Sequence, residues 1–167
     1  TENFVLGRWI RGEGEGTPLF HALHGSEIAR ASTQGLDFRA ITEYARATGG
    51  AALRSMTFQE RGRMLKKLAL HLHSKKDAFY AVSAKTGATR ADSWIDIEGG
   101  IGNLFSYASL RRQFGNEWFF VDGDTENLSR ERTFMGQHIM VPKRGVAIHI
   151  NAYNFPIWGM LEKIAVN

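Results

Sequence analysis

The chain has 167 residues, of which 43% are hydrophobic, so it is long enough to bury the core of about one domain. Its net charge of +4 comes from 21 basic and 17 acidic residues that are interspersed, a pattern that argues against nucleic-acid binding. The absence of cysteine excludes disulfides, thiolate metal sites and a cysteine nucleophile within these residues.

Two short β-like runs, residues 4–10 and 19–31, begin the chain and flank a glycine-rich stretch, GEGEG at positions 12–16. Glycine-rich loops after a strand can bind dinucleotides, but no helical pattern follows this one, and its two glutamates would repel a pyrophosphate. We therefore interpret the stretch as a turn in a hairpin or small sheet at the edge of the fold.

Two helices are predicted next from their end signals. Asp37 is suited to cap a helix through residue 47, which Gly49 and Gly50 are expected to stop. Thr57 and Glu60 form a capping-box pattern that opens a longer helix. The apolar residues that predict the core face of that longer helix are Phe58, Leu65, Leu68 and Leu72.

Two further helices follow. Ser74 and Asp77 repeat the capping pattern for a helix that ends near Gly87, and a long helix is predicted from about residue 91 to residue 113. The apolar stripe of the long helix consists of Trp94, Ile97, Ile101, Leu104, Phe105 and Ala108.

Three glycines, Gly99, Gly100 and Gly102, lie inside this long helix, where each costs on the order of 1 kcal/mol. They do not stand between a strand and a helix, as a phosphate-binding loop requires, so we expect a neighbouring element to approach the helix closely there. Three acids, Asp92, Asp96 and Glu98, lie along the same helix, but the sequence alone places no second carboxylate site opposite them, and the preference for negative charge at a helix N-terminus accounts for Asp92.

The histidines do not predict a metal site. His71 and His73 point to different faces of one helix, and His21 and His24 have a usable spacing but no acids arranged around them. His149 lies in an apolar run, where we expect a hydrogen-bonded core histidine.

Strand patterns dominate after Gly115. Residues 118–121 and the alternating residues 134–142 flank a polar loop at 122–132, and residues 146–150 form a continuous apolar run typical of a buried parallel strand. A helix is predicted to begin at Pro156, because proline is tolerated in the first helical turn. This order predicts an α/β fold and suggests part of a longer α/β protein.

The junction between this strand and the helix reads INAYNFPIWG, at residues 150–159. Asn154 could be an ordinary cap or turn residue, which is the commoner role of asparagine there. Ligands in parallel α/β folds, however, bind beyond the carboxyl ends of the strands, where residues 151–154 would lie. The pattern alone leaves both interpretations open.

The same junction resembles the aldehyde dehydrogenase superfamily, in which a strand ends in Ile-x-Pro-Trp-Asn-Phe-Pro before a helix. Here the stretch is Ile150-Asn151-Ala152-Tyr153-Asn154-Phe155-Pro156, so Asn-Phe-Pro matches and Ala-Tyr replaces Pro-Trp. Together with GGAALRSMTFQER at 49–61 and KTGATRADSWIDIEGGI at 85–101, the stretch is similar to the branch of the family that oxidises semialdehydes in phenylacetate degradation, or in benzoyl-CoA oxidation. The likeness covers nearly all of the chain.

The resemblance implies the N-terminal part of the aldehyde dehydrogenase fold, with a Rossmann-like cofactor domain. Residues 1–117 would belong to the cofactor-binding domain, residues 118–144 to the strands of an oligomerisation arm, and residues 145–167 to the first strand, turn and helix of the cofactor and catalytic region. Homo-oligomerisation through residues 118–143 is then expected.

The resemblance also implies roles for individual residues. Asn154 matches the asparagine whose amide donates to the oxyanion formed when a cysteine thiolate attacks the aldehyde. The backbone of Ile150, Asn151, Ala152 and Tyr153 matches the stretch beside the nicotinamide end of NADP or NAD. Phe155, Trp158 and Glu162 match the helix face that lines the substrate tunnel, and Lys163 matches a lysine near the asparagine.

The implied reaction is oxidation of an aldehyde, such as a CoA-linked semialdehyde, to a carboxylate. The nucleophilic cysteine and general-base glutamate of the family would lie downstream of Asn167, so we expect these residues alone to be inactive. Two alternatives remain: a binding or assembly module in which Asn154 only caps a helix, and an acylating CoA-dependent reductase.

No nucleic-acid or membrane partner is expected. No stretch reaches the ~18 consecutive apolar residues that a membrane span needs, and the N-terminus lacks the pattern of a signal peptide. A cytoplasmic location is the expectation that follows.

Overall fold

Two small antiparallel hairpins begin the protein, whose computed structural model describes residues 1–167. Strand β1 (Asn3–Val5) pairs with β2 (Arg8–Ile10), and β3 (Thr17–Phe20) pairs with β4 (Glu27–Ala31). Residues 11–16 connect the hairpins, with φ of +72° at Gly14 and +70° at Gly16, values that glycine adopts without strain. The predicted turn is thus a loop that links two hairpins instead of closing one.

The first helical segment runs without a break through α1 (Phe38–Tyr44), a π turn (Ala45–Gly49) and α2 (Gly50–Ser55). The Asp37 side chain accepts a hydrogen bond from the Ala40 amide at 2.9 Å, which confirms the predicted cap. The predicted stop at Gly49 and Gly50 is wrong, because both residues keep right-handed helical dihedrals and the helix continues to Ser55.

Helix α3 (Phe58–Ser74) begins at the predicted capping box. The Thr57 hydroxyl accepts from the Glu60 amide at 3.2 Å, and the Glu60 carboxylate accepts from the Thr57 amide at 2.8 Å. The three leucines of the predicted face pack against the buried core, and Phe58 stacks on Phe114 with ring centroids 4.6 Å apart. The predicted core face is therefore confirmed.

Helix α4 (Lys76–Ser83) and a 3₁₀ turn (Ala84–Thr86) end at Gly87, with φ of +87°, as predicted. The predicted cap is wrong, because the Ser74 hydroxyl donates to the His71 carbonyl at 2.7 Å instead of capping α4. Lys75 occupies the cap position, and its side chain makes no capping hydrogen bond.

The long helix comprises α5 (Arg90–Trp94), a π turn (Ile95–Gly99), α6 (Gly100–Leu110) and a 3₁₀ turn (Arg111–Gln113). Most of the predicted stripe faces the core, but Trp94 is 58% exposed. The π turn adds a residue to one helical turn and so changes the face that preceding residues occupy. The prediction for Trp94 assumed an unbroken α-helical period and is wrong.

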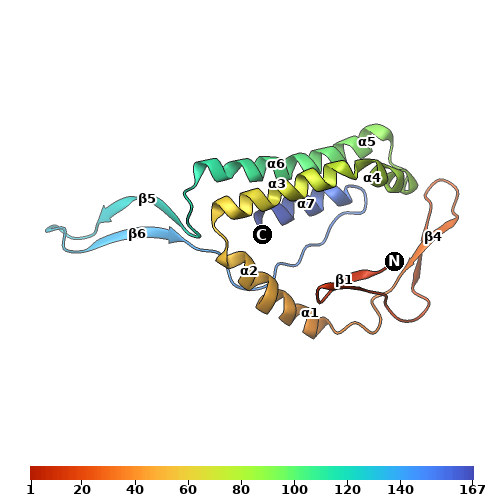
Figure 1. Ribbon diagram of the computed structural model, residues 1–167, viewed down its shortest axis with the longest axis horizontal. Coiled ribbons are helices and arrows are strands. Elements are labelled where there is room, and N and C mark those ends of the chain that lie inside the picture. The colour runs from red at the N-terminus through yellow and green to blue at the C-terminus, as the bar shows by residue number, and fades with distance from the viewer.

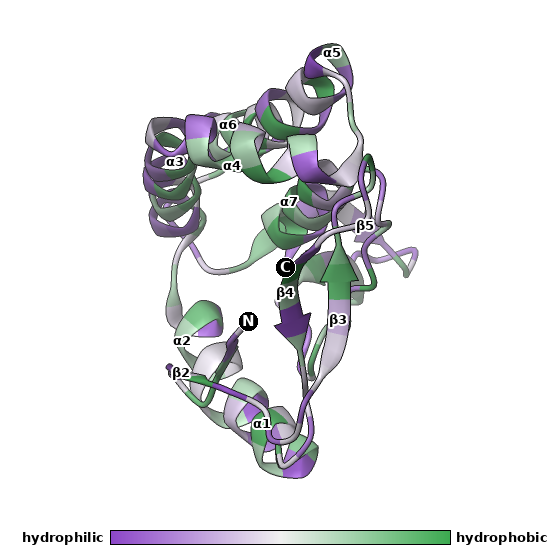
Figure 2. Cartoon of the chain, turned by 90° about the vertical axis from the view of Figure 1, so that its right-hand side faces the viewer, coloured by the Kyte–Doolittle hydropathy of each residue, from purple (hydrophilic) through white to green (hydrophobic).

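The core lies where α3, α6 and α7 (Pro156–Val166) pack side by side, with α4 alongside (Figure 1). In the side view, α7 lies against the layer that α3, α4 and α6 form (Figure 2). The buried cluster consists of Ala69, Tyr80, Ile97, Ile101, Leu104 and Leu161. Helix packing thus brings together residues that are far apart in the sequence.

A hairpin of β5 (Phe120–Asn127) and β6 (Met135–Met140) projects away from the helices (Figure 1). The two strands are antiparallel, with Phe120 opposite Met140. The polar loop predicted for residues 122–132 is partly wrong, because β5 continues to Asn127. Both faces of β5 are largely exposed, so its polar residues fit a strand that is not part of the core.

Residues 145–150 do not form the predicted buried strand. They lie outside every strand, and Ile148 and Ile150 are 85% and 87% exposed. A strand needs a hydrogen-bonded neighbour, and no segment of the chain pairs with this one. The mixed architecture of helices and strands agrees with the α/β class, but its three sheets are all two-stranded and antiparallel.

Candidate functional site

The side-chain amide of Asn154 is free. Asn154 is exposed, and its side chain makes no hydrogen bond within the protein. The cap position of α7 belongs to Phe155, which cannot cap with its side chain, and Pro156 follows as the first helical residue. The interpretation of Asn154 as the cap of this helix is therefore wrong, and its amide donor remains available to a ligand.

Asp96 caps α7 from another helix. Its carboxylate accepts hydrogen bonds from the Trp158 amide at 2.7 Å and from the Ile157 amide at 3.1 Å. These amides belong to the first turn of α7, where no intrahelical acceptor exists. Asp96 is only 3% exposed, so this buried carboxylate fixes the start of the helix two residues after Asn154.

The helix glycines allow α7 to lie close to the π turn that carries Asp96. A Cβ on Gly100 would lie 2.9 Å from Trp158 Cα, and a Cβ on Gly99 would collide with the Trp158 ring. The predicted close approach is confirmed at Gly99 and Gly100. A Cβ on Gly102 would have no neighbouring atom within 4 Å, so the prediction does not hold there.

Lys163 contacts Ile150 and Asn151, at the start of the loop of residues 150–155 that carries Asn154. Its ammonium group donates to the Asn151 side-chain oxygen at 3.2 Å and to the Ile150 carbonyl at 3.5 Å. The backbone of residues 150–153 makes no hydrogen bond to other backbone groups, and Tyr153 is 91% exposed. Backbone donors and acceptors of this stretch are thus available on the surface.

An open cavity of about 420 Å³ lies beside the loop. Its lining brings together the three predicted tunnel residues, Phe155, Trp158 and Glu162, with others from the loop and two helices. The Trp158 indole donates to the Glu162 carboxylate at 3.0 Å, so these two side chains form one wall. The other lining residues are Ile95, Ala152, Gly159 and Lys163.

Comparison of the sequence with known proteins shows its family. Residues 9–167 match the aldehyde dehydrogenase family. The chain belongs to the aldehyde dehydrogenase family. It is also 38% identical over 164 residues to 3,4-dehydroadipyl-CoA semialdehyde dehydrogenase of Aromatoleum evansii. That alignment covers 98% of this chain and 32% of the relative, so the chain spans about a third of the relative's length.

Within this aldehyde dehydrogenase sequence, sequence reasoning missed three site residues, Asp96 and the cavity residues Ile95 and Gly159. The hydrogen bonds of Asp96 reach residues 61 and 62 positions away, so no local pattern announces them. The one available signal was that the expected close approach at Gly99 and Gly100 lies one helical turn from Asp96.

A second polar cluster of the aldehyde dehydrogenase chain surrounds Glu98, on the same π turn. The Glu98 carboxylate accepts from the Tyr80 hydroxyl at 2.9 Å and from the Lys76 ammonium at 3.2 Å, and these bonds hold the pKa of Glu98 below its ordinary value. Burial, followed by the Glu98 hydrogen bond, raises the pKa of Tyr80. Arg90 lies over the Tyr80 ring, 3.4 Å from its centroid. This network joins α4 to the helix that carries Asp96.

The histidines considered in the sequence analysis do not come together in one site. His149 is half-buried and hydrogen-bonds Asn167 at 2.9 Å, so it is hydrogen-bonded as predicted but lies outside the core. His21 and His24 stack on each other with centroids 3.8 Å apart. No three potential metal ligands cluster in the structure, and none of its helices combines the length and apolarity of a membrane span.

Proposed function

We propose that the protein is an aldehyde dehydrogenase that oxidises a CoA-linked semialdehyde to a carboxylate, with NADP or NAD as hydride acceptor. The observation that carries this proposal is the free amide of Asn154, exposed on a loop whose far end is clamped by buried Asp96. The name of the relative, a CoA semialdehyde dehydrogenase, supports a semialdehyde attached to CoA as the substrate class.

Asn154 would act on the oxyanion. When a thiolate attacks an aldehyde carbonyl, a carbon–sulfur bond forms and the carbonyl π electrons move to oxygen. The neutral amide of Asn154 donates a hydrogen bond to that oxygen and needs no change of protonation to do so. Removing one such donor typically costs about 2.7–4 kcal/mol of barrier.

The thiolate itself lies outside these residues, because the chain contains no cysteine. We therefore propose that the 167 residues alone do not oxidise aldehydes. They supply the oxyanion donor, part of the substrate cavity and part of the cofactor surface.

The clamp at Asp96 would keep the Asn154 donor in place. Hydrogen bonds to an ionised acceptor are stronger than neutral ones, and this carboxylate accepts at the positive end of the helix. Catalytic donors work because they are positioned before the reaction, so a fixed helix start limits the reorganisation that the loop needs. Asp96 is a positioning residue in this proposal.

The stretch at residues 150–153 fits the nicotinamide end of a dinucleotide. Its backbone groups are exposed and largely unpaired, as a surface that hydrogen-bonds a cofactor requires. The dinucleotide, when bound, accepts the hydride. Ile150, Asn151, Ala152 and Tyr153 would orient it, with Lys163 holding the first two in place.

Two further assignments complete the proposal. Phe155, Trp158 and Glu162 line the aldehyde's path, since all three face one cavity. The hairpin β5–β6 acts as the arm of a homo-oligomer, because exposed apolar side chains such as Phe134, Met135 and Ile139 would be covered by a second subunit. A cytoplasmic location remains our expectation.

The test of this function uses the full-length protein with a CoA-linked semialdehyde and NADP or NAD. We expect thiol-dependent formation of the reduced dinucleotide and a free carboxylic acid as product. An acyl-CoA formed from the aldehyde carbon in the presence of free CoA would instead indicate an acylating reductase. Absence of any dinucleotide reduction with every aldehyde tested would contradict the proposal.

A further inference from the structure

Gly159 lies in the interior of helix α7, where packing gives no reason for a glycine. Glycine inside a helix destabilises it relative to alanine. A Cβ on Gly159 would make an ordinary contact of 3.5 Å with the Lys163 ammonium nitrogen and would meet no other neighbouring element, whereas a Cβ on Gly99 or Gly100 would lie too close to Trp158. The helix therefore has room for a side chain at position 159, and the reason for its absence lies outside helix packing.

The cavity beside Asn154 supplies a reason. Gly159 is the only glycine in the lining of this cavity. Phe155, Glu162 and Lys163 also line it, four residues before Gly159 and three and four residues after it. Residues at these spacings share one face of a helix. A side chain at position 159 would therefore extend into the cavity from the middle of the face that lines it.

Hydrogen bonds and close packing fix the neighbouring side chains, so they do not move into the space that Gly159 leaves. The Trp158 indole donates to the Glu162 carboxylate at 3.0 Å, and the Trp158 ring lies against Gly99. The Lys163 ammonium donates to acceptors in residues 150–151. The space therefore remains available to a ligand.

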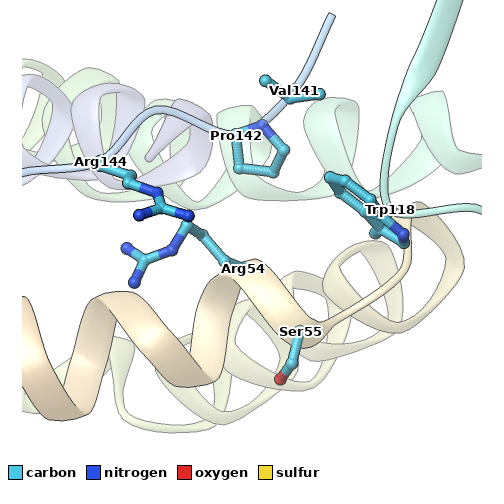
Figure 3. A pocket seen from close by; sticks show the side chains of 6 residues that line it. All are labelled: Arg54, Ser55, Trp118, Val141, Pro142 and Arg144. Atoms are coloured by element: carbon cyan, nitrogen blue, oxygen red, sulfur yellow. The ribbon is translucent and has the colours of Figure 1, made fainter.

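The other cavity of this size, about 440 Å³ at the base of the β5–β6 hairpin, has the opposite arrangement (Figure 3). No glycine lines it, and the side chains of Arg54 and Arg144 extend toward each other within it (Figure 3). It shares no residue with the cavity beside Asn154. Space left by a missing side chain thus distinguishes the cavity beside Asn154 from this one.

The cavity with Gly159 is next to the proposed oxyanion donor. Ala152 and Phe155 line it, and Asn154 lies between them in the chain. A molecule whose carbonyl oxygen meets the Asn154 amide therefore has this cavity beside the rest of its chain. The volume of about 420 Å³ is within the range of small-molecule sites, and the apolar side chains of Ile95, Phe155 and Trp158 suit the methylene groups of an acyl chain.

We propose that Gly159 is a specificity-determining residue, whose missing side chain admits a long aldehyde that continues into a thioester. The inference rests on the proposed function for its substrate class, a CoA-linked semialdehyde. A short aldehyde needs only the part of the cavity next to Asn154, so it fits whether or not position 159 carries a side chain. A larger residue at position 159 therefore excludes the long substrate selectively.

Binding to the full-length protein tests this inference without catalysis. The probe is adipyl-CoA, a CoA thioester with a free carboxylate at the other end of its acyl chain, measured by calorimetry. We expect Gly159→Leu to weaken adipyl-CoA binding about tenfold or more, because leucine takes the space of the acyl chain. Gly102→Leu, at a helix glycine with open space around it, is the matched control and should bind as the wild type does.

A smaller substitution guards against misfolding. Gly159→Ala adds a methyl group that fits, so this variant should unfold at or above the wild-type temperature and should weaken adipyl-CoA binding by a smaller factor than leucine does. If circular dichroism shows that Gly159→Leu does not fold, the alanine variant decides, and adipyl-CoA binding equal to that of the wild type would then overturn the inference.

Kinetics separate specificity from a merely structural role. For Gly159→Leu we expect kcat/KM for the CoA-linked semialdehyde to fall about tenfold or more, and kcat/KM for propanal to stay within about threefold of the wild type. Equal losses for the two aldehydes, unchanged adipyl-CoA binding in the folded leucine variant, or a wild type that does not bind adipyl-CoA would overturn the inference. A wild type that oxidises no aldehyde, but whose adipyl-CoA binding is weakened by Gly159→Leu as expected, would contradict the proposed function and leave this inference standing.

Discussion

The helical core and the extended segment 141–155 differ in how far their apolar side chains are buried and in how their backbone groups are hydrogen-bonded. Every buried hydrophobic residue lies in a helical element, and those residues are Ala69, Tyr80, Ile97, Ile101, Leu104, Ala108 and Leu161. In the extended segment Ile148, Ile150 and Tyr153 are 85%, 87% and 91% exposed. A helix pairs its backbone groups internally, whereas an extended segment depends on neighbours. The buried apolar side chains therefore belong to the helices, whereas the extended segment leaves these large apolar side chains exposed.

Asn154 lies where these two regions meet. The residues before it are extended and exposed, and the residues after it are fixed by the buried carboxylate of Asp96. Such a position combines an accessible amide with a rigid attachment. The helical side of the junction should therefore be what fixes the position of Asn154. Substitutions in the helices and in the extended segment should then differ in their effect on stability.

The largest difference should come from truncating an apolar residue in each region. Leu104→Ala removes a fully buried side chain from the core and should lower the free energy of unfolding by about 2–5 kcal/mol. Ile148→Ala, in the exposed segment, should change it by less than about 0.5 kcal/mol. Urea denaturation of the 167-residue chain measures both. Similar losses in the two variants would refute the division between core and segment.

The next largest effect should come from removing the Asp96 carboxylate, which accepts hydrogen bonds from the first turn of α7. Asp96→Ala leaves the Ile157 and Trp158 amides without their acceptor and should cost about 1–3 kcal/mol of stability. In the full-length enzyme it should lower kcat more than it raises KM, because the Asn154 loop loses its attachment. Asp96→Asn keeps an acceptor oxygen and should recover part of both losses. Asp77→Asn, at the exposed start of α4, is the control.

A glycine pair tests the close packing of α7. Gly100→Ala places a methyl group about 3 Å from the Trp158 backbone and should destabilise the protein by about 1–3 kcal/mol. Gly102→Ala, in the same helix but with open space around it, should stabilise it by about 0.5–1 kcal/mol. Thermal unfolding of both variants gives the sign directly. Stabilisation by Gly100→Ala would mean that α7 does not lie this close.

A smaller effect is the pH-dependent contribution of the Tyr80–Glu98 hydrogen bond to stability. The pKa of Glu98 is lower in the folded chain than its ordinary value of 4.5, chiefly because the Tyr80 hydroxyl donates to it. A lowered carboxyl pKa contributes stability that is present above the unfolded value and is lost as pH falls through the folded value. Tyr80→Phe should therefore cost about 1 kcal/mol at pH 7, and the difference from wild type should shrink below about pH 4.

Tyr107→Phe is the matched control for that measurement, because the Tyr107 hydroxyl makes no hydrogen bond within the protein and its side chain is 37% exposed. Its unfolding free energy should follow the wild type across the same pH range. A Tyr80→Phe deficit that stays constant from about pH 7 to about pH 3 would show that the hydroxyl stabilises the protein without involving the charge of Glu98.

Local signals predicted the helices well. The cap at Asp37 and the capping box at Thr57 and Glu60 involve residues three positions apart, so the sequence contains all that they need. The stop expected at Gly49 and Gly50 failed because glycine permits a helix end without requiring one. Trp94 was misplaced because periodicity cannot reveal a π turn.

The site was predicted less completely than the helices. Resemblance suggested Asn154 as the oxyanion donor, which stays a prediction, and grouped Phe155, Trp158 and Glu162, which do line one cavity. Patterns alone favoured a cap or turn role for Asn154. Asp96 escaped because its partners lie 61 and 62 residues away. The strand expected at residues 146–150 was predicted from its apolar run, which carries no information about whether a pairing partner is present.

The central claim is that the Asn154 amide stabilises the oxyanion, and the single-turnover rate of dinucleotide reduction in the full-length enzyme tests it most directly. With Asn154→Ala we expect this rate to fall on the order of a hundredfold or more, with unchanged folding and with Gln113→Ala, an exposed amide outside the site, at the wild-type rate. An Asn154→Ala enzyme that reduces the dinucleotide at the wild-type rate would contradict the account.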